Sequence, residues 1–148
     1  MPNIAPWVLY AVLGAVAAAF TGIFAKVGME GIDSTMATTI RAAVGTLYLI
    51  GFTTVLGKWP HVSTVNRKAF LMIVLAGIAG ATSWLFQYRA YAVGGPVAKV
   101  AALDKLSVPI AVVLAVILLG EKLQRLNWLG VILIIAGAYL VAYKPVAT

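Results

Sequence analysis

Three charged residues lie within segments that are otherwise apolar. Arg41 precedes the uncharged run 42–57, and Asp104 and Lys105 precede the uncharged run 106–120. At 1.5 Å per residue the second run makes about 22 Å of helix, which is shorter than a hydrocarbon core of about 30 Å. A membrane helix built on either run must therefore draw the preceding charges into the bilayer. Each charge costs about 2.5–3.5 kcal/mol at a helix centre, so we expect these side chains to face the protein interior or water.

The chemistry open to these residues is ion pairing, solute recognition or proton carriage. Arg41 and Asp104 each lie about seven residues into helices that start from the same face, which gives both a depth near 10 Å. We therefore predict an Arg41–Asp104 pair that leaves Lys105 facing a cavity, about 100° away around the helix. Proton carriage by Asp104 is disfavoured because two neighbouring cations hold a carboxylate in its charged form. A purely structural charge network is the alternative.

Further polar and aromatic groups gather in the same half of the chain's membrane segments. The third apolar segment ends with "TSWLFQYR", and Thr38 lies one turn from Arg41. An interfacial aromatic belt is the alternative explanation for Trp84, Tyr88 and Tyr91. We predict a water-accessible pocket for a solute, with eight pathway candidates: Thr38, Arg41, Trp84, Gln87, Tyr88, Asp104, Lys105 and Ser107.

Pro109 has no N–H to donate to the carbonyl of residue 105, so the fourth helix should bend there. Bent helices with freed carbonyls line cavities and act as hinges in transporters. We therefore interpret Pro109 as a hinge, with a kink used only for packing as the alternative.

The composition indicates an integral membrane protein. Of 148 residues, 63% are hydrophobic and 10% are charged, whereas soluble domains have roughly 45–50% apolar and 25% charged residues. The sequence has no cysteine and one histidine, His61. We therefore expect no thiolate or histidine metal site, no cofactor and no catalytic residues, and hence no enzyme. The net charge of +7 is scattered between apolar segments, so we expect no nucleic-acid partner.

Continuous apolar runs without strand alternation predict an all-α membrane fold with five transmembrane helices. We treat residues 1–148 as a single transmembrane domain. The predicted spans are approximately 7–27, 34–56, 69–88, 97–119 and 126–143.

The loop charges give a weak orientation signal. Five spans place five basic residues on one side and four on the other, whereas the positive-inside rule needs an excess. One fixed orientation and dual topology, with copies inserted both ways, both fit this balance. The first set is Lys58, Arg67, Lys68, Lys122 and Arg125, and the second is Lys26, Arg89, Lys99 and Lys144.

Small residues recur at helical spacing in three of the predicted spans. Gly14, Ala18 and Gly22 share one helix face, as do Gly77 with Ala81 and Gly130 with Gly137. Such faces let helix backbones approach closely in lipid. Packing within the chain and a dimer interface are both open interpretations.

The stretches "IFAKVGMEGIDSTMATTIRAAVG", "SWLFQYRAYAVGGPVAKVAALDKLSVPIAVVLAVILLGEKL" and "WLGVILIIAGAYLVA" resemble the EamA domain of the drug/metabolite transporter (DMT) superfamily. The resemblance covers nearly the whole chain and is to the single-domain, five-helix type. It implies one half of a ten-helix inverted-repeat architecture. It also implies an exporter or exchanger of small metabolites with its site between two domains.

The leading hypothesis is a secondary transporter of small polar or amphipathic metabolites in the cell (plasma or inner) membrane. An antiparallel homodimer, with the solute site between protomers, would rebuild the inverted repeat. The alternative is a non-transporting membrane subunit that assists the assembly or regulation of a partner. The excess of cations over membrane carboxylates favours an anionic or zwitterionic solute.

Overall fold

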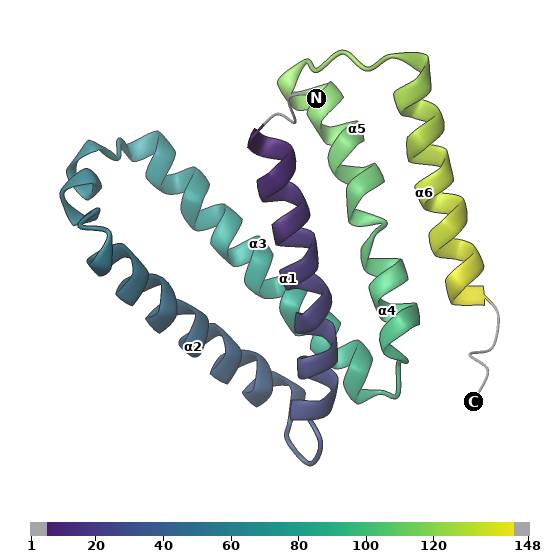
Figure 1. Cartoon of the computed structure of the whole chain (residues 1–148), viewed down its shortest axis with the longest axis horizontal. Helices are drawn as coiled ribbons and strands as arrows, with labels where there is room; N and C mark the ends of the chain where they lie inside the picture. Colours follow the sequence, from purple (N-terminus) through teal and green to yellow (C-terminus); the bar gives the residue numbers. More distant parts are fainter. Residues whose placement is uncertain (1–5, 144–148) are drawn as a thin grey trace. The chain divides into compact units, whose positions relative to one another are not determined.

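The structure, a computed structural model, describes residues 6–143, and every regular element in that range is a helix (Figure 1). The predicted all-α class is therefore confirmed for this part of the chain. The helices are α1 (Pro6–Gly28), α2 (Ser34–Val55), the short 3-10 helix η1 (Trp59–Thr64), α3 (Arg67–Ala92), α4 (Val97–Asp104), α5 (Ser107–Leu119) and α6 (Arg125–Tyr143).

Four stretches of the described chain are long and apolar enough to cross a membrane. They are Pro6–Gly28, Arg67–Ala92, Val97–Leu119 and Arg125–Tyr143. The second predicted span, α2, is not among them, because threonines and Arg41 dilute its apolar residues. The structure thus supports a membrane protein with several spans, without confirming the count of five.

Two predicted spans differ from the observed helices. The third helix continues to Ala92, four residues past the predicted end at Tyr88. Gly94, at φ 95°, then turns the chain in a conformation that favours glycine. The fourth span is interrupted: α4 ends at Asp104 and α5 begins at Ser107.

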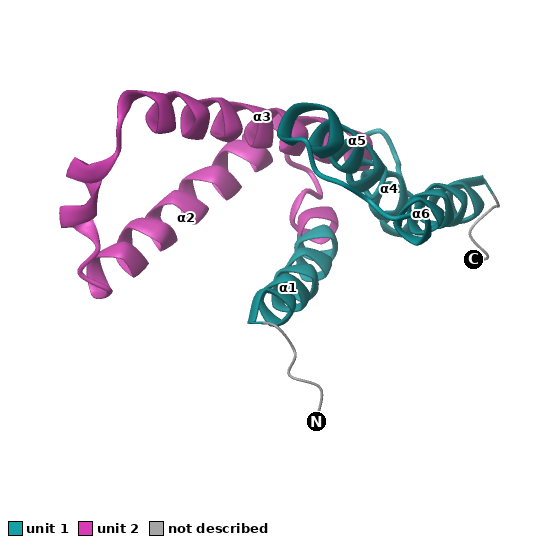
Figure 2. Ribbon diagram, turned by 90° about the horizontal axis from the view of Figure 1, so that it is seen from above, with its two compact units in different colours: residues 1–24, 93–148 teal, residues 25–92 magenta. Residues whose placement is uncertain are grey.

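The chain divides into two compact units (Figure 2). One holds residues 25–92, where α2 packs on α3. These two helices lie close together where α2 begins and α3 ends, and they diverge toward η1 (Figures 1 and 2). The other unit holds residues 6–24 and 93–143 of the described chain, where α6 packs on α4 and α5. Its buried side chains include Pro109, Val131 and Ala138.

Four of the glycines on the small-residue faces have open space beside them in the described chain. A methyl group added at Gly14, Gly77, Gly130 or Gly137 would meet no atom within 4 Å. The observed packing therefore gives no support to tight packing within the chain at these four glycines.

Asp33 starts α2. Its carboxylate accepts hydrogen bonds from the backbone N–H groups of Thr35 (2.9 Å) and Met36 (3.1 Å). Side-chain acceptors at this position satisfy N–H groups that have no partner within the helix. The bonds from Met36 and Thr35 lower the pKa of Asp33 below its usual range.

This cap predicts a pH dependence of α2. The pKa of Asp33 is lower in the folded protein than in the unfolded chain. The stabilisation of α2 by the Asp33 carboxylate is therefore complete above the unfolded pKa, about 3.9, and is lost as pH falls through the folded pKa. We expect acidification from about pH 5 to pH 3 to lower the melting temperature of the wild type toward that of Asp33→Ala. Circular dichroism in detergent measures this shift. Asp33→Asn is the matched control, since its amide oxygen caps without titrating, so an equal acid response in this variant would contradict the assignment.

Candidate functional site

The Arg41 side chain lies on two aromatic rings of α3. Its guanidinium carbon is 4.0 Å from the Trp84 ring centroid and 6.0 Å from that of Tyr88. A cation over a ring face is attracted by the ring quadrupole, by about 0.5–2 kcal/mol depending on desolvation. Nη1 of Arg41 is buried and has no hydrogen-bond partner in the described part of the chain. Arg41 therefore combines a fixed position with unused hydrogen-bonding capacity.

Two helix faces build this arrangement. Ser34, Thr38 and Arg41 share one face of α2, and Trp84, Tyr88 and Tyr91 share one face of α3. Ser34, Thr38, Tyr88 and Tyr91 are buried. The Thr38 hydroxyl donates to the Ser34 carbonyl at 2.8 Å. The burial of Tyr88 argues against a lipid-facing aromatic belt for this residue.

A second cation lies in the same unit. Lys26, in the last turn of α1, donates from Nζ to the Tyr91 carbonyl at 2.9 Å. The rings of Tyr88 and Tyr91 lie next to each other, with centroids 6.5 Å apart. We call Lys26, Arg41, Trp84, Tyr88 and Tyr91 the Arg41 cluster.

The sequence interpretation did not include Lys26 and Tyr91 among the site residues. Ending the third span at Tyr88 placed Tyr91 in a loop, where helical spacing has no meaning. The spacing of Trp84, Tyr88 and Tyr91 could have placed Tyr91 with the other two rings, because residues i, i+4 and i+7 share a helix face. Gln87 lies on α3 beside this face and is half-buried.

The remaining candidates lie in the other unit, at the junction of α4 and α5. Lys105 Nζ lies 3.5 Å from Asp104 Oδ2, with side chains 58% and 38% exposed. A pair this long and this exposed contributes little to stability. Arg41 and Asp104 belong to different units, so their predicted pair stays a prediction.

The helix breaks at Lys105 and Leu106, just before Pro109. The Lys105 carbonyl accepts from the Val108 N–H at 3.0 Å, in place of the N–H that Pro109 lacks. Pro109 thereby lies in the first turn of α5, where a missing N–H is tolerated. Ser107 is the exposed first residue of this helix. A hinge motion at the junction is a prediction that the structure leaves untested.

We expect Pro109→Ala to join α4 and α5 into one helix, since the new N–H can bond the Lys105 carbonyl. Spin labels on Val97→Cys and Leu119→Cys, in this cysteine-free chain, should then lie near the 33 Å of a straight 22-residue rise. Double electron–electron resonance measures the distance. The control is the doubly labelled protein that keeps Pro109 and carries Val108→Ala, which should show the wild-type distance. Equal distances with and without Pro109 would refute the role of the proline.

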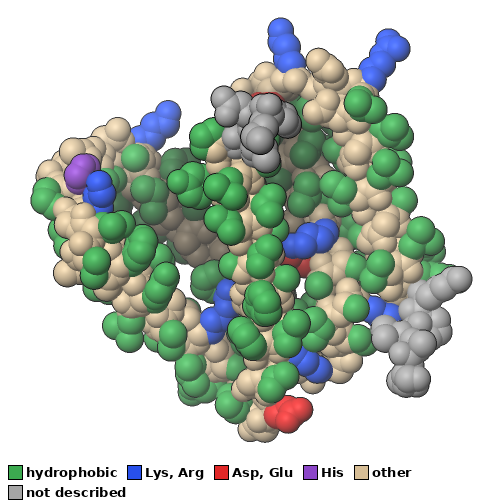
Figure 3. Space-filling view, in the orientation of Figure 1, with side chains coloured by type: hydrophobic (Ala, Val, Ile, Leu, Met, Phe, Trp, Pro, Cys, Tyr) green, Lys and Arg blue, Asp and Glu red, His purple; other side chains and the backbone are tan. Residues whose placement is uncertain are grey.

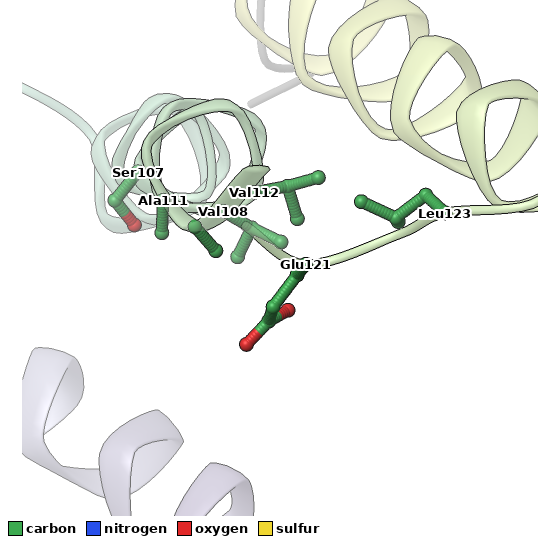
Figure 4. A pocket seen from close by; sticks show the side chains of 7 residues that line it. Ser107, Val108, Ala111, Val112, Glu121 and Leu123 are labelled. Atoms are coloured by element: carbon green, nitrogen blue, oxygen red, sulfur yellow. The ribbon is translucent and has the colours of Figure 1, made fainter. Parts of the chain in front are cut away.

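Two grooves run along α5 in its unit, each with a volume of about 430 Å³. The first is mainly aliphatic and also holds Ser107 and Glu121. Figure 4 shows Val112 pointing toward Leu123, while the Glu121 carboxylate extends away from the helix. The second groove lies between α5 and α6 and is wholly apolar. Neither groove includes a member of the Arg41 cluster.

Apolar helices of membrane length, with a partly buried cation held among aromatic rings, are typical of proteins that move solutes across membranes. The chain belongs to the EamA-like transporter family, whose model matches residues 5–143. This confirms the resemblance to the drug/metabolite transporter superfamily.

A relative from Sinorhizobium sp. supports the same assignment. This protein, named "Uncharacterized transporter in cobO 3'region", is 42% identical over 136 residues, which are 92% of this chain and 96% of the relative. No solved structure matches the chain.

Proposed function

We propose that the chain is a secondary transporter, an exporter or exchanger of small polar or amphipathic metabolites, in the cell (plasma or inner) membrane. The observation that carries the proposal is the guanidinium of Arg41, which lies 4.0 Å from the centre of the Trp84 ring with a buried, unbonded Nη1. A transported solute must exchange its hydration for protein contacts at membrane depth. A held cation with free donors and two neighbouring rings supplies such contacts.

Charge favours an anionic or zwitterionic solute. The unit of residues 25–92 has two carboxylates, Glu30 and Asp33, and both lie in the connection between α1 and α2. Asp33 is engaged in capping α2. Arg41 and Lys26 thus meet no acidic side chain from the helices of their own unit, and a carboxylate or phosphate group of the solute would neutralise them.

We further propose that α2 is the fifth span. Four of its threonine hydroxyls donate to carbonyls four residues earlier, at 2.8–2.9 Å: those of Thr38, Thr39, Thr46 and Thr54. A hydroxyl that is bonded within its own helix enters lipid without losing a hydrogen bond. Because the 22 residues of α2 make about 33 Å of helix, the length suffices to cross the bilayer.

An antiparallel homodimer, with the solute site between protomers, completes the proposal. The support is the balance of basic residues between the two predicted sides, together with room for a methyl group at Gly14, Gly77, Gly130 and Gly137 in the described chain. A C-terminal reporter fusion tests it: activity on both sides of the membrane is expected. Activity on one side alone would refute the dual topology.

The transport proposal is tested with purified protein. A thermal-shift screen against carboxylate-, phosphate- and amine-bearing metabolites should reveal an anionic or zwitterionic ligand, because binding to the folded state raises its apparent stability. The same compound should then enter or leave proteoliposomes that contain this chain alone. A ligand that stabilises the protein without any flux would favour the non-transporting subunit.

A further inference from the structure

The connection between α2 and α3, residues 57–68, carries positive charge and no negative charge. Lys58, Arg67 and Lys68 lie within it, together with His61, and all four side chains are exposed. Figure 3 shows the histidine beside basic side chains on this part of the surface, with no acidic side chain among them. We call residues 57–68 the basic connection.

The carboxylates of the same unit are too distant to neutralise this charge. Glu30 and Asp33 precede α2, whereas the basic connection follows it. The helix in between has 22 residues, about 33 Å in length, which is several times the screening length of about 8 Å at physiological salt. Arg67 and Lys68 also lie in the first turn of α3, where the helix dipole disfavours cations. The charge therefore calls for an external anion.

The backbone of the basic connection is compact, and its uncharged polar groups are bonded locally. The hydroxyls of Ser63 and Thr64 donate to the Pro60 and His61 carbonyls at 2.8 and 2.7 Å. Asn66 Oδ1 accepts from the Ala69 N–H at 2.8 Å. The segment thus leaves its basic side chains free to bind another molecule.

Apolar side chains accompany the charges. Trp59 is 48% exposed, and Val62 and Val65 are 61% and 42% exposed. The indole Nε1 of Trp59 donates to the Thr54 hydroxyl at 2.9 Å, which fixes the ring at the end of α2. A tryptophan at a helix end next to lysine and arginine is the usual composition of the membrane–water interface.

We propose that the basic connection is a membrane-surface site that selects anionic phospholipids. Lys58, Arg67 and Lys68 contact lipid phosphate and headgroup oxygens, while Trp59 inserts at headgroup depth. The charge complementarity is to the lipid surface itself, because the segment joins α2 to α3 and ends directly at both; the inference rests on the proposal that α2 is the fifth span. Each basic side chain near an anionic surface contributes about fivefold in affinity at low salt.

Fluorescence quenching by brominated lipids tests this proposal. The cysteine-free chain allows a single bimane label on Ser63→Cys, within the full-length protein in nanodiscs of phosphatidylcholine and phosphatidylglycerol. Bromine is placed on one lipid or the other in matched samples. We expect phosphatidylglycerol to be enriched next to the label several-fold over its share of the bilayer, and the enrichment to fall at high salt.

Substitution assigns the effect to the three basic residues. Lys58→Gln, Arg67→Gln and Lys68→Gln together should abolish the enrichment, and each alone should reduce it in part. Lys122→Gln with Arg125→Gln, in a different connection, is the matched control and should leave it intact. Equal quenching by both lipids in the wild type would overturn the proposal. Enrichment that persists in the triple variant would also overturn it. If the triple variant does not fold, enrichment that is unchanged in each of the three single variants would do the same.

Discussion

Arg41→Ala is expected to lower solute affinity by about 10-fold to 150-fold and to reduce flux accordingly. The guanidinium is held 4.0 Å from the centre of the Trp84 ring, and its buried Nη1 has no partner in the described chain. A hydrogen bond from a charged group to a solute contributes about 1.5–3 kcal/mol, which corresponds to the stated loss of affinity. Uptake into proteoliposomes measures the flux, and the ligand-induced thermal shift measures the binding.

Conservative substitutions at Arg41 and Trp84 distinguish a role in solute binding from a role in charge balance alone. Arg41→Lys keeps the charge but loses the planar, forked donors that stack on rings and grip carboxylates. The solute affinity of Arg41→Lys should therefore lie between that of Arg41→Ala and that of the wild type. Trp84→Phe should retain more activity than Trp84→Leu, because a phenyl ring still attracts a cation.

Arg89→Ala is the matched control for the arginine change. Arg89 lies on the same unit, near the end of α3, and its side chain is exposed. Its loss should change flux by less than about twofold, since exposed charges contribute little. If Arg41→Ala unfolds cooperatively and still shows the wild-type ligand shift and flux, Arg41 has no role in solute binding.

The sequence predicted the helical class and most helix boundaries because apolar runs of membrane length leave few alternatives. The third helix was underestimated because Arg89 reads as a loop charge. In the structure Arg89 is exposed while Tyr88 and Tyr91 are buried on the other side of the same helix. A single charged residue can thus end an apolar run without ending the helix.

The two aromatic contacts of Arg41 were not predicted as contacts, although Trp84 and Tyr88 were both among the pathway candidates. Equal depth in the sequence predicts the opposite charge of Asp104 as a partner for Arg41, and that pair stays a prediction. The observed neighbours, Trp84 and Tyr88, are uncharged rings, and a cation–ring contact leaves no pattern of opposite charges in a sequence. Pro109 was more informative, because a missing N–H has a definite partner four residues earlier.

Asp104→Asn is expected to raise the affinity for an anionic solute by about fivefold and to slow its release. The reason is the predicted depth match, under which the Asp104 carboxylate competes with the solute for Arg41. Among the described residues of its own unit, Asp104 has only a long contact with the exposed Lys105, at 3.5 Å. It also ends α4, where the helix dipole disfavours a carboxylate. Asp104 thus has reason to bind a further cation.

A double-mutant cycle makes this prediction specific. If Asp104 acts through Arg41, then Asp104→Asn must have no effect on affinity once Arg41→Ala is present, so the two changes are non-additive. Glu121→Gln is the control, as it removes a carboxylate that lies beyond the end of α5. Isothermal titration of the four cycle members with the identified solute measures the coupling. An equal gain in affinity from Asp104→Asn with and without Arg41 would show that the two residues act independently, and the carboxylate would then have to act directly on the solute or through Lys105.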